Sequence, residues 1–368
     1  MADINVLQTL IQFRRGTEDL WDLVKDTYIP RAGEPCTTID TETGKNQVKV
    51  GDGVNTWGKL KYIGEGELEV TKIYSDSPES TETTVDGKVY ATVEEAVSNA
   101  SAGSELILSG SLGSTTINID KELVVNMNGV EAVNDEQTPV VVGINGKVTL
   151  KDGGLECNKH GEPSLENNGE VIIDDCNLTR SVDEAGNGYY AGFNHGKMTI
   201  NSGVFSTPGG LSSLIENGYY NYTSGNAETG YVAGKNQEYP ELIINGGSFI
   251  TKFIAVKNDD GGYTTINGGN FYGCIQNAGM ELTINGGYFE RQWDGTNYMI
   301  NCTKYDTPYN TAKLVITGGT FIGRINFGTS EAVISGGKFN ESVDDQYIAE
   351  GYEQNYTDGW YVISKKGA

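Results

Sequence analysis

The sequence predicts a mainly β chain whose longest part winds as a parallel β-helix. Three observations predict this fold: a recurring Ile-Asn-Gly-Gly-x-Phe pattern or a close variant of it, a short spacing between its copies, and 50 glycines among 368 residues. The clear copies end at Phe249, Phe271, Phe289, Phe321 and Phe339, and weaker ones end at Leu155, Leu178 and Phe205. The shortest intervals, 18 to 23 residues, fit one coil of a β-helix.

Each copy predicts a short strand, a tight corner at Asn-Gly-Gly and a second strand opened by Phe. We expect the Ile residues to stack into one internal ladder and the Phe residues into a second. At the corners, Asn245, Asn267 and Asn285 are expected to tolerate left-handed backbone and to hydrogen-bond the coils above and below. The 44-residue interval before Phe249 holds either two coils or one long excursion. The sequence leaves open whether residues 216–240 form a coil or a loop.

The β-helix is assigned to residues 91–343 and begins with a capping helix. Thr92-Val-Glu-Glu95 is a capping-box pattern, which predicts a helix over residues 93–100. Strands are expected at residues 105–108, 115–119 and 122–126. A helix that covers a first coil resembles the N-terminal cap of pectate-lyase-like right-handed β-helices, and this resemblance alone implies the right hand. Parallel stacking follows from the repeat itself.

The last segment, residues 344–368, is expected to form a β-hairpin cap. Residues 347–352 and 359–363 are the two predicted strands. An open β-helix end exposes unpaired backbone groups, so a cover over the last coil is expected there. The aromatic side chains of this segment are therefore assigned to packing rather than to binding.

Residues 1–64 predict a small α+β module that is separate from the repeats. Residues 10–14 alternate as a half-buried strand does, Thr17 can N-cap a short helix, and Pro30 and Gly33 end that helix. Residues 38–41 and 47–50 predict two strands of a hairpin, and Gly51-Asp52-Gly53 predicts a turn. Trp21 and Trp57 are the large residues available to fill its core.

A series of landmark residues runs through this module in a fixed order: Arg14, Arg15, Trp21, Glu34, Asp40, Lys49, Gly51, Asp52 and Trp57. This order resembles the N-terminal virion-anchoring module of bacteriophage fibres. Leu20 and residues 28–30 depart from the family pattern, and a generic hairpin with a Gly-Asp-Gly turn is the alternative interpretation. The resemblance implies that the module ties the chain to the particle while the rest projects. The glycine-rich repeats are also similar to proteins of gut-phage lineages, including crAss-like phages.

The charge of the chain is concentrated after the module. Residues 1–63 carry eight Lys/Arg and nine Asp/Glu, net −1, whereas the rest carries 18 against 41, net −23. Such acidity argues against nucleic acid as a partner, because phosphate binding needs clustered Lys and Arg. It is expected to keep projecting copies soluble and apart. Residues 65–90, rich in Ser, Thr and Glu, are assigned to a linker or an extended arm.

Several functional classes are disfavoured by what the sequence lacks. No apolar stretch is long enough to span a membrane, and no secretory signal peptide is visible, so no membrane partner is expected. The five cysteines form no Cys-x-x-Cys pair, and the only histidines, His160 and His195, lie in separate loops. No metal, no cofactor and no nucleophilic triad is therefore predicted.

The longest departure from the repeat is the candidate recognition segment. Tyrosine rings can stack on sugars, although they can equally fill a groove between subunits or pack on the flank of the shaft. The candidate glycan-binding residues are Tyr219, Tyr220, Tyr222, Tyr231, Tyr239 and Trp293. A polysaccharide hydrolase would need a pair of carboxyl groups. Available carboxyls are Asp174, Asp175, Asp183, Glu216, Asp259, Asp260 and Asp294, and no spacing singles out a pair.

The expected function is therefore that of a non-enzymatic structural appendage of a phage virion. Its partners would be itself, as a homotrimer by analogy with phage β-helical spikes, a capsid or tail protein bound by the N-terminal module, and a host-surface glycan. A short chain with a neutral anchor favours a head fibre. A tail fibre or receptor-binding tailspike, with or without glycosidase activity, is the alternative. The expected location is the virion, assembled in the host cytoplasm and released by lysis.

Overall fold

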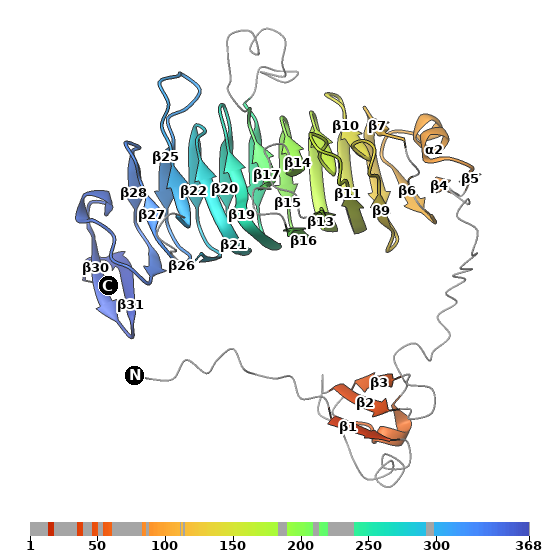
Figure 1. Ribbon diagram of the computed structural model, residues 1–368, viewed down its shortest axis with the longest axis horizontal. Coiled ribbons are helices and arrows are strands. Elements are labelled where there is room, and N and C mark those ends of the chain that lie inside the picture. Colours follow the sequence, from red (N-terminus) through yellow and green to blue (C-terminus); the bar gives the residue numbers. More distant parts are fainter. Residues whose placement is uncertain are drawn as a thin grey trace. The chain divides into compact units, whose positions relative to one another are not determined.

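The structure is a computed structural model, and it describes residues 14–17, 35–39, 46–50, 54–60, 83–85, 88–110, 112, 115–182, 190–208, 213–219, 239–291 and 298–367. The chain divides into two compact units, Met1–Pro78 and Glu79–Ala368 (Figure 1).

The N-terminal unit contains a three-stranded sheet. Strand β1 (Arg14–Thr17) pairs in parallel with β2 (Pro35–Ile39), and β2 pairs antiparallel with β3 (Asn46–Val50). A short 3-10 helix, η1 (Trp57–Lys59), follows. The predicted hairpin is thus present, although its first strand begins at Pro35, earlier than expected. The first strand of the unit includes Thr17, while residues 10–13 and the predicted helix lie outside the described residues.

The second unit is a β-helix-like shaft built from three parallel ladders of strands. Ladder I runs along the shaft from end to end, and its strands pair in parallel from one coil to the next. Its strands are β6 (Ser104–Leu108), β8 (Glu122–Asn126), the first parts of β11 (Lys147–Glu156) and β13 (Glu170–Thr179), β15 (Lys197–Ile200), β18 (Glu241–Ile244), β20 (Tyr263–Ile266), β22 (Glu281–Ile284), β25 (Lys313–Ile316) and β28 (Ala332–Ile334).

Ladders II and III complete each coil. Ladder II consists of β9 (Glu131–Val133), the second parts of β11 and β13, β16 (Val204–Thr207), the first parts of β19 (Ser248–Asn258) and β21 (Asn270–Asn277), β23 (Tyr288–Glu290), β26 (Thr320–Ile322) and β29 (Gly337–Phe339). Ladder III consists of β7 (Ile117–Ile119), β10 (Val140–Val142), β12 (Leu165–Asn167), β14 (Tyr190–Asn194), β17 (Ser213–Asn217), the second parts of β19 and β21, β24 (Ile300–Cys302) and β27 (Ile325–Asn326).

The inside of the shaft is filled by rows of like residues. The repeat Ile residues are fully buried in ladder I. In ladder II the rings of the Phe residues stack with centroids 4.6–4.9 Å apart and planes within 9° of parallel, in the order Phe205, Phe249, Phe271, Phe289, Phe321 and Phe339. Both predicted ladders are therefore present. Successive side chains of a strand point to opposite faces of the sheet. The residues on either side of each buried Ile or Phe therefore point to the outside of the shaft.

Ladder III contains a buried asparagine row that the sequence analysis missed. Each side-chain amide donates to the amide oxygen one coil further along, at 2.7 to 3.1 Å, and the row consists of Asn167, Asn194, Asn217, Asn258 and Asn277. All are fully buried. The last amide donates to the sulfur of Cys302 at 3.9 Å. We call this row the asparagine ladder, and it satisfies polar groups that would otherwise be orphaned inside the core.

The corners of the Asn-Gly-Gly repeat differ from the prediction in one respect. Asn285 donates to Asn267, and Asn267 donates to Asn245, each at 2.9 Å, as expected. The left-handed backbone, however, falls on the second glycine and not on Asn: Gly269 has φ +106° and Gly287 has φ +110°. These values suit glycine alone, because a Cβ would crowd the carbonyl of the preceding coil.

The 44-residue interval contains a single coil. Strand β15 pairs directly with β18, and β16 pairs directly with β19, so no second coil stands between them. The interval still contributes β17 to ladder III, and Tyr219 forms an isolated bridge with Asp260 beyond it. Residues 220–238 lie outside the described residues.

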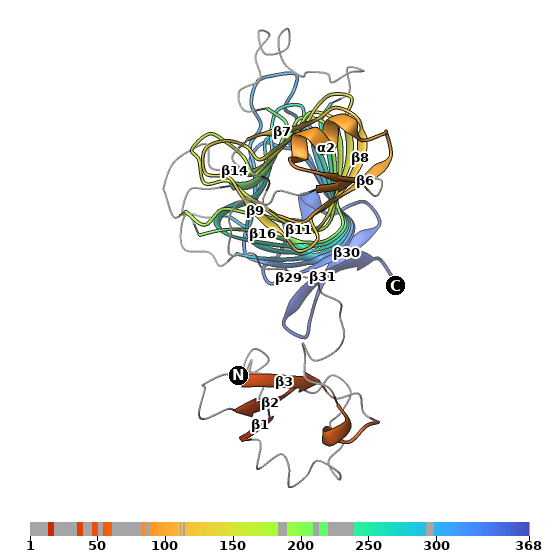
Figure 2. The same ribbon diagram turned by 90° about the vertical axis from the view of Figure 1, so that its right-hand side faces the viewer.

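Both ends of the shaft are partly covered. Helix α2 (Val93–Asn99) lies at one end (Figure 2), where Thr92 accepts a hydrogen bond from the Glu95 amide at 3.2 Å and Val93, Ala96 and Val97 join the core. Strands β4 (Thr83–Val85) and β5 (Lys88–Tyr90) form an antiparallel pair beside β6.

At the other end, β30 (Tyr352–Thr357) and β31 (Trp360–Lys365) form a hairpin. Its turn, Asp358-Gly359, has positive φ at both residues, which is the two-residue turn that suits strand twist. Strand β31 pairs antiparallel with β29 and so covers ladder II. The first hairpin strand was predicted at residues 347–352, but β30 begins only at Tyr352. The predicted segment instead starts at the last residue of the 3-10 helix η3 (Asp345–Tyr347), and Ile348 bridges to Ile334 on ladder I.

Candidate functional site

Two landmarks of the N-terminal module contact each other. The ammonium of Lys49 lies 4.6 Å from the centroid of the Trp57 ring and donates to the Trp57 carbonyl at 3.2 Å. Both residues are buried, with exposed fractions of 8% and 3%. A buried lysine held by a ring face and a carbonyl stabilises the module's own fold. Arg14 and Arg15 lie on β1, and Trp21, Glu34, Asp40, Gly51 and Asp52 lie outside the described residues.

Three ionisable side chains form a buried cluster on the outer side of ladder III. Glu216 on β17 and Lys257 on β19 are register partners. The Lys257 ammonium lies 3.4 Å from Oε1 of Glu216 and 2.5 Å from Oδ2 of Asp259. Less than a tenth of each of the three side chains is exposed. We call these three residues the buried ion cluster.

The buried ion cluster has one cation for two carboxylates. Burial raises the pKa of Glu216 to about 8; Lys257 opposes this shift, and the negative charge of Asp259 adds to it. The pKa of Lys257 is raised despite its burial, because both carboxylates favour its charged form. Burial likewise raises the pKa of Tyr190 to about 12. Near neutral pH Glu216 therefore keeps its proton, and Lys257 keeps its positive charge.

An aromatic group lies along the same part of the chain. The rings of Tyr190 and Phe193 are 4.8 Å apart, and the His195 ring stacks on Tyr219 at 4.6 Å with planes 4° from parallel. Burial lowers the pKa of His195 to about 4, so its imidazole is neutral at physiological pH. Tyr219 also donates its backbone N–H to the Asp260 carbonyl at 3.0 Å. The contacts with His195 and Asp260 hold Tyr219 in place after the end of β17.

Of the seven candidate carboxyls, the structure brings two together around Lys257. Glu216 and Asp259 belong to the buried ion cluster, and Asp260 is adjacent and 4% exposed. Asp174 lies on ladder I as the register partner of Lys151, and Asp175 occupies a corner with φ +55°. Asp183 and Asp294 lie outside the described residues. A carboxyl with a raised pKa beside a second carboxyl is an arrangement used in acid catalysis, but ion pairing and burial restrict this pair.

No match was found to a family model, a curated protein or a solved structure. Functional inference for this chain therefore depends on its own residues and on the geometry of the described part.

The candidate glycan-binding tyrosines occupy different environments. One face of Tyr219 is covered by His195, whereas Tyr239 is 44% exposed and its ring lies 6.0 Å from that of Tyr263. Tyr263, which is 39% exposed, was not singled out from the sequence. It opens one of the repeat copies at a place where other copies have Glu or Lys, and this was the available signal. Tyr220, Tyr222, Tyr231 and Trp293 lie outside the described residues.

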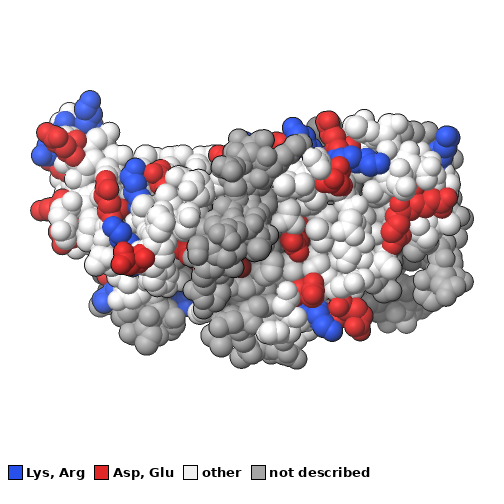
Figure 3. Space-filling model, turned by 90° about the horizontal axis from the view of Figure 1, so that it is seen from above, with Lys and Arg blue, Asp and Glu red and all other residues white. Residues whose placement is uncertain are grey.

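The outer face of ladder I carries a row of register partners that begin their strands. We call this row the charged column: Glu122, Lys147, Glu170, Lys197, Glu241, Tyr263, Glu281 and Lys313. Ion pairs link Lys147 to Glu170 at 3.4 Å, Lys197 to Glu241 at 3.2 Å and Lys313 to Glu281 at 3.0 Å. Acidic and basic side chains also lie beside one another on the face shown in Figure 3. Alternating charge favours the observed register.

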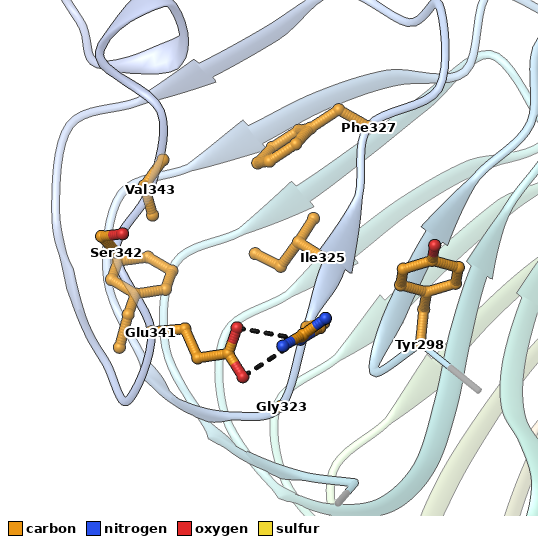
Figure 4. A pocket seen from close by; sticks show the side chains of 9 residues that line it. Tyr298, Gly323, Ile325, Phe327, Glu341, Ser342 and Val343 are labelled. Carbon is orange, nitrogen blue, oxygen red and sulfur yellow. Dashed lines mark hydrogen bonds and ion pairs between the residues drawn. The ribbon is translucent and has the colours of Figure 1, made fainter. Parts of the chain in front are cut away.

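A pocket of about 190 Å³ lies at the C-terminal end of the shaft (Figure 4). Ile325, Phe327 and Phe339, which line it, belong to the core or pack against it. At its rim, Nε of Arg324 donates to both carboxylate oxygens of Glu341, at 3.2 and 3.0 Å. It is smaller than the roughly 300 Å³ at which small-molecule sites usually begin. The pocket is best described as the incompletely covered end of the core.

Metal and thiol chemistry find little support in the described part of the chain. No group of three His, Cys, Asp or Glu side chains there is arranged to hold a metal ion. Cys157, Cys176, Cys274 and Cys302 are buried free thiols, and burial raises the pKa of the last three to about 12. Such thiols are inert at neutral pH. Among the described helices, none has the length and apolarity needed to cross a membrane.

Proposed function

We propose that the chain is a head fibre of a bacteriophage virion. In this proposal residues 1–64 anchor the protein to the capsid, and residues 91–343 form a right-handed parallel β-helix that projects outward. Three copies associate as a homotrimer, and the projecting face contacts glycans of the host surface. The proposal makes the protein a structural and adhesive component without enzymatic activity.

The observation that carries the proposal is the contact between Lys49 and Trp57. Both belong to the ordered series of landmarks that resembles the fibre anchor, and they hold each other at 3.2 and 4.6 Å inside a unit separate from the shaft. A generic hairpin does not require a lysine buried on a tryptophan. The remaining 290 residues form a unit whose inner rows serve stacking, which suits a part that projects.

The proposal is tested by imaging purified virions labelled with an antibody against the shaft. Label on the capsid facets supports a head fibre, label on the tail supports the alternative, and virions without label refute both. Addition of excess purified chain to particles that lack it should restore the label. The Lys49→Met chain should restore less than the wild-type chain, whereas Lys59→Met, on η1 but exposed, should equal it. Equal melting temperatures would exclude misfolding as the cause.

A tailspike with glycosidase activity is the second candidate, favoured by one observation. Burial raises the pKa of Glu216 to about 8, and Asp259 is bound to the same lysine, so the cluster holds the pair of carboxyl groups that a glycosidase uses. Incubation with host capsule followed by a reducing-end assay tests it. New ends that disappear in Glu216→Gln would establish the enzyme, and no new ends with the wild-type chain would reject it.

A further inference from the structure

The charged column of ladder I is interrupted at one position. From Glu122 to Glu241 the column alternates in sign, so a cation would be expected at the next coil. Tyr263 stands there instead, between Glu241 and Glu281 in register. Five successive coils therefore read Lys, Glu, Tyr, Glu, Lys. Two carboxylates flank an aromatic ring, each about 4.8 Å along the shaft from it.

The two flanking carboxylates are held in place from their far sides. Glu241 pairs with Lys197 at 3.2 Å, and Glu281 pairs with Lys313 at 3.0 Å. Glu281 also accepts a hydrogen bond from the Thr283 hydroxyl at 2.9 Å. Each carboxylate has about four acceptor sites, so these partners leave capacity for a further donor. In register, Lys197 and Lys313 lie one coil beyond the two glutamates, on the sides away from Tyr263.

The ring of Tyr263 is accessible and has an aromatic neighbour. Tyr263 and Tyr239 are 39% and 44% exposed, and their rings are tilted by 53° at a centroid distance of 6.0 Å. Two tilted rings offer two faces to one small group. Aromatic faces attract cations, and neighbouring carboxylates attract the same cation by their own negative charge.

We propose that the interruption of the charged column at Tyr263 is a binding site for a cationic amino sugar. The C–H face of a hexosamine ring stacks on Tyr263, with Tyr239 at its edge. Its ammonium group takes the place of the missing cation and donates to the carboxylates of Glu241 and Glu281. A uronic or sialic acid is repelled by the same carboxylates and by a chain with a net charge of −24.

This inference rests on the adhesive part of the proposed function, for which it names the ligand class. It is independent of where the fibre is attached, because the site lies wholly within the shaft. If virion imaging fails and amino-sugar binding succeeds, the attachment is wrong and the site stands. If imaging succeeds and binding fails, only the site is wrong.

The test is calorimetric titration of the purified full-length chain with two matched ligands. One is a tetramer of glucosamine and the other is its fully N-acetylated form, which has the same rings without the charge. The titration is run at about pH 6, where the sugar amines are protonated. We expect the charged tetramer to bind and the acetylated tetramer to bind at least about tenfold more weakly, since one lost cation contact is of that size. Binding should also weaken with added salt.

Three variants locate the site. Tyr263→Ala should weaken binding of the charged tetramer about tenfold or more. Tyr263→Lys should abolish binding, because it supplies the missing cation from within the chain. Tyr272→Ala is the control: it removes a tyrosine of nearly equal exposure, 41%, that lies on ladder II away from the charged column. It should change the affinity less than about twofold.

The stability of the Tyr263→Lys chain is measured as well, so that loss of binding can be distinguished from loss of the fold. Tyr263→Lys should unfold at a urea concentration equal to or higher than that of the wild type, because it pairs with both glutamates. A folded Tyr263→Lys chain that still binds the tetramer would overturn the inference. Equal binding of both tetramers, or undiminished binding by Tyr263→Ala, would overturn it as well.

Discussion

Asn217 offers the sharpest test of what holds the coils of the shaft together. Its side-chain amide is fully buried and donates to Oδ1 of Asn258 at 3.1 Å, to the Tyr263 carbonyl at 3.0 Å and to the Thr264 hydroxyl at 3.1 Å. Its oxygen accepts from Asn194 at 2.7 Å. Asn217→Ala removes all four bonds inside the core, where water cannot replace them.

The expected loss follows from these contacts. Each hydrogen bond contributes about 1 kcal/mol net, and a buried group left without a partner costs more, so we expect Asn217→Ala to lower the free energy of unfolding by about 3 to 5 kcal/mol. Asn267→Ala is the matched control. Asn267 also belongs to a row of stacked asparagines, with bonds of 2.9 Å to Asn245 and Asn285, but it is exposed. Water replaces its partners, so its loss should stay below about 1 kcal/mol.

The assay is urea unfolding of the full-length chain followed by far-ultraviolet circular dichroism. Stability differences are taken from the midpoints if the slopes of the transitions agree. Far-ultraviolet dichroism reports on the shaft, which contains most of the described strands. If Asn217→Ala and Asn267→Ala shift the midpoint equally, burial of the asparagine ladder is not what stabilises the stack. A shift for Asn217→Ala of less than about 1 kcal/mol would lead to the same conclusion.

Three further predictions concern the inner stack, the corners and the buried ion cluster. Phe271→Ala should lower the free energy of unfolding in urea by about 3 to 5 kcal/mol, because it leaves a cavity in the middle of the Phe row. A loss below about 1 kcal/mol would show that the row repacks. Gly269→Ala should lower the free energy of unfolding by about 1 to 3 kcal/mol, since φ is +106° and a Cβ would lie 3.1 Å from the Gly247 carbonyl oxygen. Gly103→Ala is the control and should lower it less, because Gly103 also has positive φ but a Cβ there would meet open space. The pKa of Glu216, raised to about 8 from an ordinary value near 4.5, makes the folded state retain a proton that the unfolded state loses, so stability should fall as pH rises from about 4.5 to 8 and level off above. Glu216→Gln should remove this contribution, at most about 1.4 kcal/mol per pH unit, and an unchanged pH profile of the unfolding midpoint would contradict the raised pKa.

The sequence predicted what depends on local pattern. The repeat positions of Ile244 and Phe249 were enough to place both inner rows, because stacked coils bury the same position of every copy. The capping box at Thr92 was enough to place α2. The asparagine ladder could have been found from a second recurrence, an Asn followed by Gly within one to three residues, as at Asn194 and Asn277. It was overlooked because its spacing varies with the loops.

The buried ion cluster could not be predicted, because its contacts depend on which coils are neighbours in the shaft. Glu216 and Lys257 are 41 residues apart in the chain, and their pairing follows only from the absence of a coil between β15 and β18. The burial of Asp259 likewise depends on the corner around Tyr219. The number of coils in this interval decides which residues face each other across it, and the sequence leaves that number open. No sequence spacing could therefore select these carboxyls among 50 acidic residues.

Residues in the inner rows of the shaft are constrained by core packing, whereas residues in the outer rows are not. This difference is why the interruption of the charged column at Tyr263 indicates a function. An inner position is restricted to side chains that fill the core and leave no polar group unpaired, because a void or an unsatisfied group there is costly. An outer position has no such need, so a regular outer row reflects pairing, as in the ion pairs from Lys147 to Glu241. A lysine at position 263 would extend that pairing to two glutamates that now flank a tyrosine.

Tyr263 is exposed and does not form the ion pairs that a lysine would form at the same position. An exposed residue that stabilises the fold less than an alternative would is typical of a binding site. If Tyr263→Lys proves more stable than the wild type and no longer binds the amino sugar, stability and binding are opposed at this one coil. If it proves less stable, the tyrosine is there for packing and the outer row carries no information about function.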